Sequence, residues 1–387
     1  MKSFFMLGRN PQISVAEVLS YLEARDVTVE GWELEKSALL IETKEKLDLV
    51  RMLKSLGGSI AAGEIWASGA DEEVLTYIEN NDICPWTETK FDYSLASFCP
   101  APLMDEVTAE MKRAFKNLRV KAMNKPALGL VELQDGAQSG GSPKKMLTRD
   151  RVYFLFKGKQ TSFGIIKAIF DVDDARKRDM GKPVRREALA ISPRMARILI
   201  NLAQIKEGQT VLDPFCGIGV ILHEAMLQGM NATGIDVDTS AVEGAKTNDE
   251  WLKRTYSLHV TSKIILGDSK KTWVDKADGM ASEPSLGEVL KEEVSQEKAT
   301  RMILQFERLI TAVLNNMRQS LKPGAKMVFT TPYILTKKGR VGCDVEVLLK
   351  DTGLKMHELK YGKEIKFPIT ESREGKIVAR QIFVFEK

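Results

Sequence analysis

Cysteine and histidine are scarce in this sequence, which has four cysteines and three histidines among 387 residues. They lie far apart, and no two cysteines have the Cys-x-x-Cys spacing: Cys84, Cys99, Cys216, Cys343, His223, His259 and His357. This scatter disfavours zinc ribbons, iron–sulfur sites and the disulfide scaffold of a small secreted protein. We therefore expect no bound metal.

Long apolar segments are also missing from the sequence. No run approaches the roughly 18 residues that a membrane-spanning helix needs. The first apolar stretch, Phe4–Leu7, is too short for a signal peptide. We expect a cytoplasmic protein with no membrane partner.

Charge is distributed unevenly along the chain, although the net charge is only +4. Residues 112–186 hold 19 Lys and Arg against 7 Asp and Glu, a net charge of +12, while the rest of the chain sums to −8. A concentrated positive field favours a polyanionic partner, most often a nucleic acid. The alternative is that each basic cluster is a solvated face on a separate element. The RNA-binding candidates are Lys112, Lys116, Arg119, Arg178 and Arg185.

The length and the pattern of apolar segments predict three domains and a linker. Residues 1–65 mix strands and helices as an α+β domain, and residues 66–170 repeat this mixture around a Gly/Ser-rich loop at 135–143. Residues 171–192 are a linker. In residues 193–387 apolar strands alternate with helices, which is typical of a doubly wound α/β sheet. Within the domains we expect helices over 44–56, 193–204 and 288–297, and one that Ser14 caps.

Three polar loops follow successive predicted strands of the last domain. The first contains Gly217 and Gly219, which let the backbone approach a ligand closely. The second ends in Asp236, placed to accept hydrogen bonds from a ribose, and the third carries Asp268 and Ser269, suited to an adenine rim. The loops lack the Gly-x-Gly-x-x-Gly pattern of nicotinamide enzymes. Since parallel strands end at one edge of a sheet, they predict a nucleoside-cofactor site there.

These loops, DPFCGIG, GIDVD and GDS, resemble motifs of class I S-adenosylmethionine-dependent methyltransferases. Three further stretches resemble the THUMP-domain RNA methyltransferases that modify tRNA guanine N2: FFMLGRNPQISVAEV, RKRDMGKPVRREALAISPRMARILINLA and SREGKIVARQIFVFEK. The resemblance implies a ferredoxin-like domain, a THUMP domain and a Rossmann-like catalytic domain with an antiparallel last strand. It also implies S-adenosylmethionine as cofactor and guanine 10 of tRNA as target. Asp213, Phe215, Gly217 and Gly219 would line the cofactor loop, Asp236 would hold the ribose, and Asp268 with Ser269 would meet the adenine.

The sequence departs from the family pattern where an Asp/Asn-Pro-Pro-aromatic motif is usual. Glu283 and Pro284 stand there as the catalytic candidates, followed by Ser285 and Leu286 in place of an aromatic residue. A carboxylate and a backbone carbonyl that accept the protons of an exocyclic amine make it a better nucleophile, while an aromatic ring holds the flipped base. Glu283 could instead be an acid at a helix start. Phe329 or Tyr333 could supply the missing ring.

The function that these features predict is methyl transfer to N2 of a tRNA guanosine, without a metal. Two alternatives stay open at this point. One is an RNA-binding protein whose methyltransferase domain is catalytically impaired, and the other is an amino-methyltransferase that acts on DNA. Eukaryotic proteins that resemble this chain work with a small activator subunit, so such a partner also stays open. For Arg178 and Arg185, a structural role at an interdomain joint competes with contact to RNA phosphates.

Overall fold

The computed structural model describes residues 1–125, 150–186, 191–288, 290–372 and 375–387. These residues form two compact units. Unit 1 comprises Met1–Pro11, Thr28–Lys54 and Gly58–Ala175, and unit 2 comprises Gln12–Val27, Ser55–Gly57 and Arg176–Lys387. The Gly/Ser-rich loop predicted over 135–143 lies outside the described residues.

Unit 1 is built on one eight-stranded sheet with the strand order β2-β3-β1-β4-β8-β7-β5-β6. Neighbouring strands are antiparallel except that β5 runs parallel to both β6 and β7. The strands are β1 (Lys2–Leu7), β2 (Val29–Glu35), β3 (Ala38–Thr43), β4 (Ser59–Gly69), β5 (Lys90–Phe98), β6 (Lys121–Asn124), β7 (Asp150–Lys157) and β8 (Thr161–Ile169). The predicted boundary after residue 65 falls inside β4, so one sheet spans both predicted N-terminal domains. The division of this half into two modules stays a prediction.

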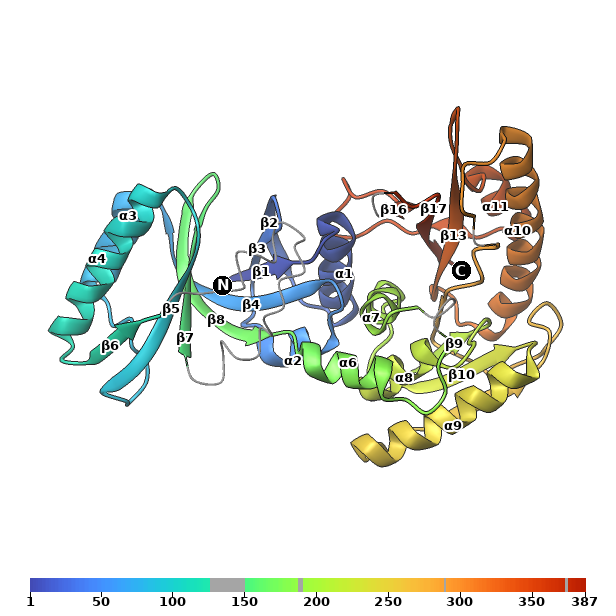
Figure 1. Ribbon diagram of the computed structural model, residues 1–387, viewed down its shortest axis with the longest axis horizontal. Coiled ribbons are helices and arrows are strands. Elements are labelled where there is room, and N and C mark those ends of the chain that lie inside the picture. Colours follow the sequence, from blue (N-terminus) through green and yellow to red (C-terminus); the bar gives the residue numbers. More distant parts are fainter. Residues whose placement is uncertain (126–149, 187–190, 289, 373–374) are drawn as a thin grey trace. The chain divides into compact units, whose positions relative to one another are not determined.

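Three helices accompany this sheet: α2 (Leu49–Ser55), α3 (Asp71–Asn80) and α4 (Ala101–Asn117). Figure 1 shows α3 and α4 lying together beside the strands of unit 1. The pattern of buried residues explains this packing, because Val107, Met111 and Phe115 recur at helical spacing on one face of α4. They pack in a common core with Tyr153 and Phe163 of the sheet.

Unit 2 is a mixed sheet with the strand order β11-β10-β9-β12-β13-β17-β15. The first five strands of this order are parallel, and β17 is antiparallel to both of its neighbours, as the resemblance implied. The strands are β9 (Thr210–Asp213), β10 (Asn231–Asp236), β11 (Ser262–Leu266), β12 (Gly279–Ser282), β13 (Lys326–Thr336), β14 (Gly339–Val341), β15 (Lys355–Met356), β16 (Ile369–Glu371) and β17 (Val378–Glu386). The doubly wound α/β prediction for this part of the chain is confirmed.

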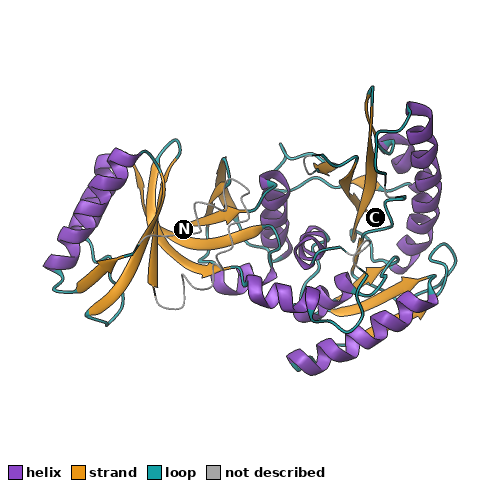
Figure 2. Ribbon diagram, viewed as in Figure 1, coloured by secondary structure: helices purple, strands orange, loops and turns teal. Residues whose placement is uncertain are grey.

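Helices cover both faces of the unit 2 sheet (Figure 2). They are α7 (Pro193–Leu202), α8 (Val220–Leu227), α9 (Thr239–Tyr256), α10 (Gln296–Met317) and α11 (Val345–Thr352), and α6 (Val172–Met180) precedes them. Ser192 caps α7, since its side chain accepts a hydrogen bond from the Met195 N–H at 3.2 Å. None of the described helices is long and apolar enough to cross a membrane.

Three helix predictions need correction. The helix expected over 288–297 begins only at Gln296, because Ser295 is its N-cap and accepts the Lys298 N–H. The helix expected over 44–56 is limited to Leu49–Ser55. Helix α1 (Pro11–Ala24) begins at the proline rather than after Ser14, because proline suits the first helical turn.

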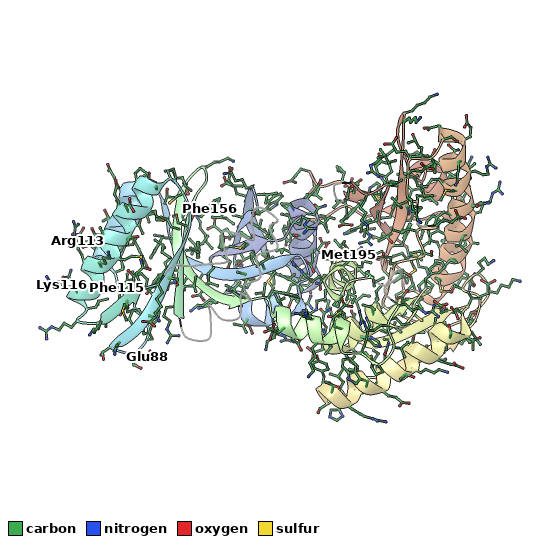
Figure 3. All side chains as sticks on the ribbon, viewed as in Figure 1. Glu88, Arg113, Phe115, Lys116, Phe156 and Met195 are labelled. Atoms are coloured by element: carbon green, nitrogen blue, oxygen red, sulfur yellow. The ribbon has the colours of Figure 1, made fainter. Side chains whose placement is uncertain are left out.

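Helix α1 belongs to unit 2, although it lies within the first 65 residues. It is buried on almost all sides, and its Glu17 is fully buried. One oxygen of Glu17 accepts the Gly57 N–H at 2.7 Å and the Asn201 Nδ2 at 2.8 Å. Figure 3 labels Met195 on α7, the helix that carries Asn201. The N-terminal helix is therefore a structural part of the unit that contains the α/β sheet.

Candidate active site

The glycine loop after β9 begins with a buried carboxylate. Asp213 is 1% exposed, and its Oδ1 accepts the Phe215 N–H at 3.1 Å and the Ser282 hydroxyl at 2.5 Å. Burial, together with the negative charges of Asp236 and Glu283, raises the pKa of Asp213 to about 7, although the two hydrogen bonds oppose this rise. Asp213 thus ties the loop to the end of β12.

The two glycines of this loop have backbones that favour glycine. Gly217 has φ +52 and Gly219, the N-cap of α8, has φ +91. A Cβ on Gly219 would also lie 2.8 Å from Nε2 of His223. The loop is held from the next strand, because Oδ2 of Asp236 accepts the Gly217 N–H at 2.8 Å and its Oδ1 accepts the Asp238 N–H at 2.9 Å. Each oxygen keeps a second lone pair for a ligand.

A cavity of about 510 Å³ opens beside this loop at the carboxyl ends of β9, β10 and β12. Six of the predicted site residues line it: Asp213, Phe215, Gly217, Asp236, Glu283 and Pro284. Gly219 adjoins this lining between Ile218 and Val220. The cavity therefore brings the predicted cofactor loop and the predicted catalytic segment together within unit 2.

The third predicted loop does not line the cavity. The Ser269 hydroxyl donates to the Pro214 carbonyl at 2.5 Å and is buried, so it braces the first loop from behind. Asp268 accepts the Lys270 N–H at 3.0 Å, and this bond keeps the pKa of Asp268 below its usual value. Val237 and Asp238 lie at the cavity in their stead. Contact of Asp268 and Ser269 with adenine stays a prediction.

Glu283 immediately follows β12 and faces the cavity. Its Oε1 accepts a hydrogen bond from Nη2 of Arg380 at 3.0 Å, while its buried Oε2 has no hydrogen-bond partner among the described residues. Burial raises the pKa of Glu283, the Arg380 charge opposes this rise, and the Glu371 charge adds to it. No described helix begins near Glu283, so the helix-start interpretation is wrong.

The ring that would stack on a base is not supplied by β13. Phe329 is fully buried and stacks on Phe383 with a centroid separation of 5.3 Å, so it belongs to the core. Tyr333 does not line the cavity, and the Arg340 guanidinium lies 5.8 Å from its ring centroid. Among the described residues that line the cavity, Phe215 is the one aromatic.

Several cavity residues were missed by the sequence analysis. Arg186 lines the cavity and pairs with Asp238 at 2.9 Å. The hydrogen bond from the Ser240 hydroxyl and then that from Arg186 hold the pKa of Asp238 at about 2. Lys376 and Arg380 also line it. Arg380 stands 97 residues after Glu283, within the stretch SREGKIVARQIFVFEK that resembles the family, but nothing in that stretch assigned it to the cavity. Only the antiparallel pairing of β17 with β13 indicates that this strand reaches the site.

The predicted RNA-binding residues fall into two groups. Lys112, Lys116 and Arg119 are exposed on α4 and just after it, and Figure 3 labels Lys116 next to Phe115, which is buried in the core of unit 1. Arg178 is 5% exposed and its Nε donates to Glu224 at 2.7 Å, so the prediction that it contacts RNA is wrong. Glu224 also pairs with Arg197 at 2.6 Å, which makes this a buried structural cluster.

Arg185, the remaining predicted RNA contact, is exposed, and its Nη2 lies 3.3 Å from the Met180 sulfur. Its contact with RNA stays a prediction. The described residues hold no group of three or more His, Cys, Asp or Glu side chains arranged to bind a metal ion.

The sequence of this region matches a known family of domains. Residues 182–332 match UPF0020, an RMKL-like methyltransferase domain. The chain is 30% identical to the tRNA (guanine(10)-N2)-dimethyltransferase of Methanothermobacter thermautotrophicus over 38% of this chain and 40% of that protein. It is 27% identical to the protein of the same name from Pyrococcus abyssi over 64% of this chain and 66% of that one. The matches thus span 40–66% of the length of these relatives.

Among solved structures, the chain is similar to that of TrmN from Thermus thermophilus. Its TM-score is 0.49, with 16% identity over 100% of both chains. The domain match has the closest bearing on the site, because residues 182–332 include the glycine loop, Asp236 and the Glu283 segment. The cavity of unit 2 therefore lies in a region that matches a methyltransferase domain.

Proposed function

We propose that this chain is an S-adenosylmethionine-dependent methyltransferase that methylates N2 of guanosine 10 in tRNA. The observation that carries the proposal is one shared cavity. The Gly217 loop and Asp236 line it together with Glu283, whose buried Oε2 has no partner among the described residues. The names of the curated relatives and the methyltransferase-domain match support the same reaction.

The cavity has the features that a nucleoside cofactor requires. Its volume of about 510 Å³ lies within the usual range of small-molecule sites. The positive φ of Gly217 keeps this part of the loop free of a side chain, and Asp236 retains lone pairs that can accept from ribose hydroxyls. When bound, S-adenosylmethionine supplies a methyl group that is attached to a positively charged sulfur. After transfer of the methyl group, that sulfur is part of a neutral sulfide.

Glu283 would act on the attacking amine. The lone pair of guanine N2 is delocalised into the ring, so the amine is a weak nucleophile. A carboxylate oxygen that accepts one N–H makes the nitrogen more electron-rich and then receives the proton as the new N–C bond forms. Oε2 of Glu283 is suited to this role, because Arg380 binds the other oxygen. Leu286, which also lines the cavity, offers an apolar contact to the base.

The N-terminal part of the chain would bind the tRNA. We infer a ferredoxin-like domain in residues 1–65 and a THUMP domain in residues 66–170, as the resemblance implies; one sheet spans both, and residues 12–27 of the first belong to unit 2. The exposed Lys112, Lys116 and Arg119 support a phosphate-binding surface on α4. The cytoplasmic location and the need for a small activator subunit stay predictions.

Methyl transfer from radiolabelled S-adenosylmethionine to unmodified tRNA tests the function. We expect label in N2-methylated guanosine at position 10. Glu283→Gln should lower kcat by at least about a hundredfold, because it removes the proton acceptor, while the affinity for the cofactor is retained. The matched control is Glu243→Gln, an exposed glutamate of α9 outside the cavity lining, which should stay active.

Other results would replace the proposal. If the protein binds cofactor and tRNA but transfers no label at high enzyme concentration, the chain is an RNA-binding protein with an impaired domain. If label enters DNA and not tRNA, the chain is an amino-methyltransferase that acts on DNA. If Glu283→Gln retains full turnover, another group accepts the proton.

A further inference from the structure

We propose that Arg380 is a positioning residue for Glu283: it holds one carboxylate oxygen and leaves the other directed to the amine that is methylated. This inference rests on the proposed function and goes beyond it, because neither the motif nor the relatives' names assign a role to Arg380. The residue lies near the start of β17, on the antiparallel part of the sheet.

The guanidinium of Arg380 bridges two carboxylates. Nη2 lies 3.0 Å from Oε1 of Glu283, and Nη1 lies 3.3 Å from Oε2 of Glu371. Glu371 stands opposite Arg380 in the β16–β17 pairing, so the strand register itself fixes one end of the bridge. Because the guanidinium is planar and rigid, binding Glu371 with one nitrogen orients the other toward Glu283.

This bridge divides the two oxygens of Glu283 between two tasks. Oε1 is used by Arg380, whereas Oε2 is buried and has no partner within the described parts of the chain. Buried acceptors are nearly always hydrogen-bonded, so a persistent exception points to a ligand. The cavity that Glu283 lines is where such a donor would arrive.

Arg380 also determines whether Glu283 can accept a proton. The charged groups recorded around Glu283 are Arg380 on β17, Glu371 on β16 and Asp213 on β9. Burial and the charge of Glu371 favour protonation of Glu283, and a protonated carboxyl cannot take a proton from the amine. The positive charge of Arg380 opposes these effects and favours the ionised form.

The same contact gives a reason for glutamate at this position, where the family usually has Asp or Asn. The longer side chain reaches from the end of β12 to the guanidinium on β17. An aspartate would withdraw the carboxylate by one methylene. Glu283 and Arg380 thus act as a pair.

The pH dependence of kcat/KM in the full-length protein tests this role. Arg380→Met should lower kcat at neutral pH by at least about tenfold and move the acid limb to higher pH, because Glu283 then ionises less readily. Arg380→Lys keeps the positive charge, so its kcat and the position of its acid limb should lie between those of wild type and Arg380→Met. Glu371→Gln removes a like charge, so it should move the limb to lower pH. Arg308→Met removes a positive charge at an exposed position of α10 and should change neither kcat nor the position of the acid limb.

A second readout does not depend on turnover. An infrared titration of the carboxylate bands, compared with Glu283→Gln, gives the protonation midpoint of Glu283, and Arg380→Met should raise it. Suppose that the wild type is active and that neither Arg380→Met nor Glu371→Gln changes the protonation midpoint of Glu283 or the acid limb. That result overturns the role of Arg380 and leaves the proposed function standing. If Arg380→Met does not fold, the Glu371→Gln shift decides the matter. A wild type that methylates no tRNA overturns the proposed function and this inference together.

Discussion

Glu17 in α1 and Asn201 in α7 are joined by a buried hydrogen bond of 2.8 Å across 184 residues of sequence. The same Glu17 oxygen accepts the Gly57 N–H, so three separate stretches of chain meet at one carboxylate. This bond attaches the N-terminal helix to the unit that carries the cavity.

Glu17→Ala should therefore destabilise unit 2. The substitution leaves the buried Gly57 N–H without its acceptor and removes one of the two acceptors of the Asn201 amide, which keeps the Ser55 carbonyl; this costs about 2 kcal/mol in the free energy of unfolding. Urea denaturation followed by circular dichroism measures the loss. Glu79→Ala, an exposed helical glutamate, should change stability by less than about 0.5 kcal/mol. Equal stability of the two variants would contradict the role of Glu17.

Gly219→Ala should weaken cofactor binding, because the new Cβ adds a clash with His223 to the backbone strain of a positive φ. The residue combines φ +91 with a His223 atom 2.8 Å from the new Cβ. Gly208→Ala is the matched control, since Gly208 has φ +80 but nothing within 4 Å of its Cβ position. Both variants should lose about 1–2 kcal/mol of stability through strain. Calorimetry with S-adenosylhomocysteine should show reduced affinity for Gly219→Ala only.

Asp213→Asn should change how stability depends on pH. The folded-state pKa of Asp213 is raised from 3.8 to about 7, so its neutral form favours folding, and this contribution is lost as pH rises from about 4 to 7. An asparagine does not ionise, so the stability of the Asp213→Asn variant has no such loss as pH rises. Relative to wild type it should gain about 2–4 kcal/mol of unfolding free energy between pH 4 and pH 7.5.

The difference between the two proteins is the quantity to measure in this case. Burial lowers the pKa of His223 to about 4, so His223 contributes stability that is lost as pH falls from about 6.5 to 4. This trend opposes that of Asp213 and masks it in the wild type alone. A constant difference between wild type and Asp213→Asn across this range would show that Asp213 is ionised throughout.

Neutralising the basic residues of α4 should weaken tRNA binding. Replacing Lys112, Lys116 and Arg119 by Gln should reduce the slope of log affinity against log salt by about 0.7–0.9 for each phosphate contact that is lost. Filter binding at several salt concentrations measures this slope. Replacing three exposed lysines of unit 2 by Gln is the control and should leave it unchanged: Lys246, Lys276 and Lys350.

The parts of the site that local sequence patterns encode could be predicted. Gly217, Asp236 and Glu283 each stand at the end of a strand in the parallel sheet, and parallel strands end at one edge. Arg380 could not be predicted, because its contact depends on the register of β17 with β13 and β16. Arg178 was a candidate for RNA contact or for a structural role, and its buried hydrogen bond to Glu224 of α8 gives it the structural role. Ser269 has the expected position in the chain, but its hydroxyl is used by Pro214.

The membership of α1 in unit 2 bears on the order in which the chain can fold during synthesis. Residues 12–27 leave the ribosome early, whereas the strands and helices that bury them follow after residue 176. Domains otherwise tend to fold one after another as they emerge. Residues 12–27 therefore complete their packing in unit 2 only after the translation of some 150 further residues, and we expect a chaperone that binds nascent apolar segments to recognise them in that interval.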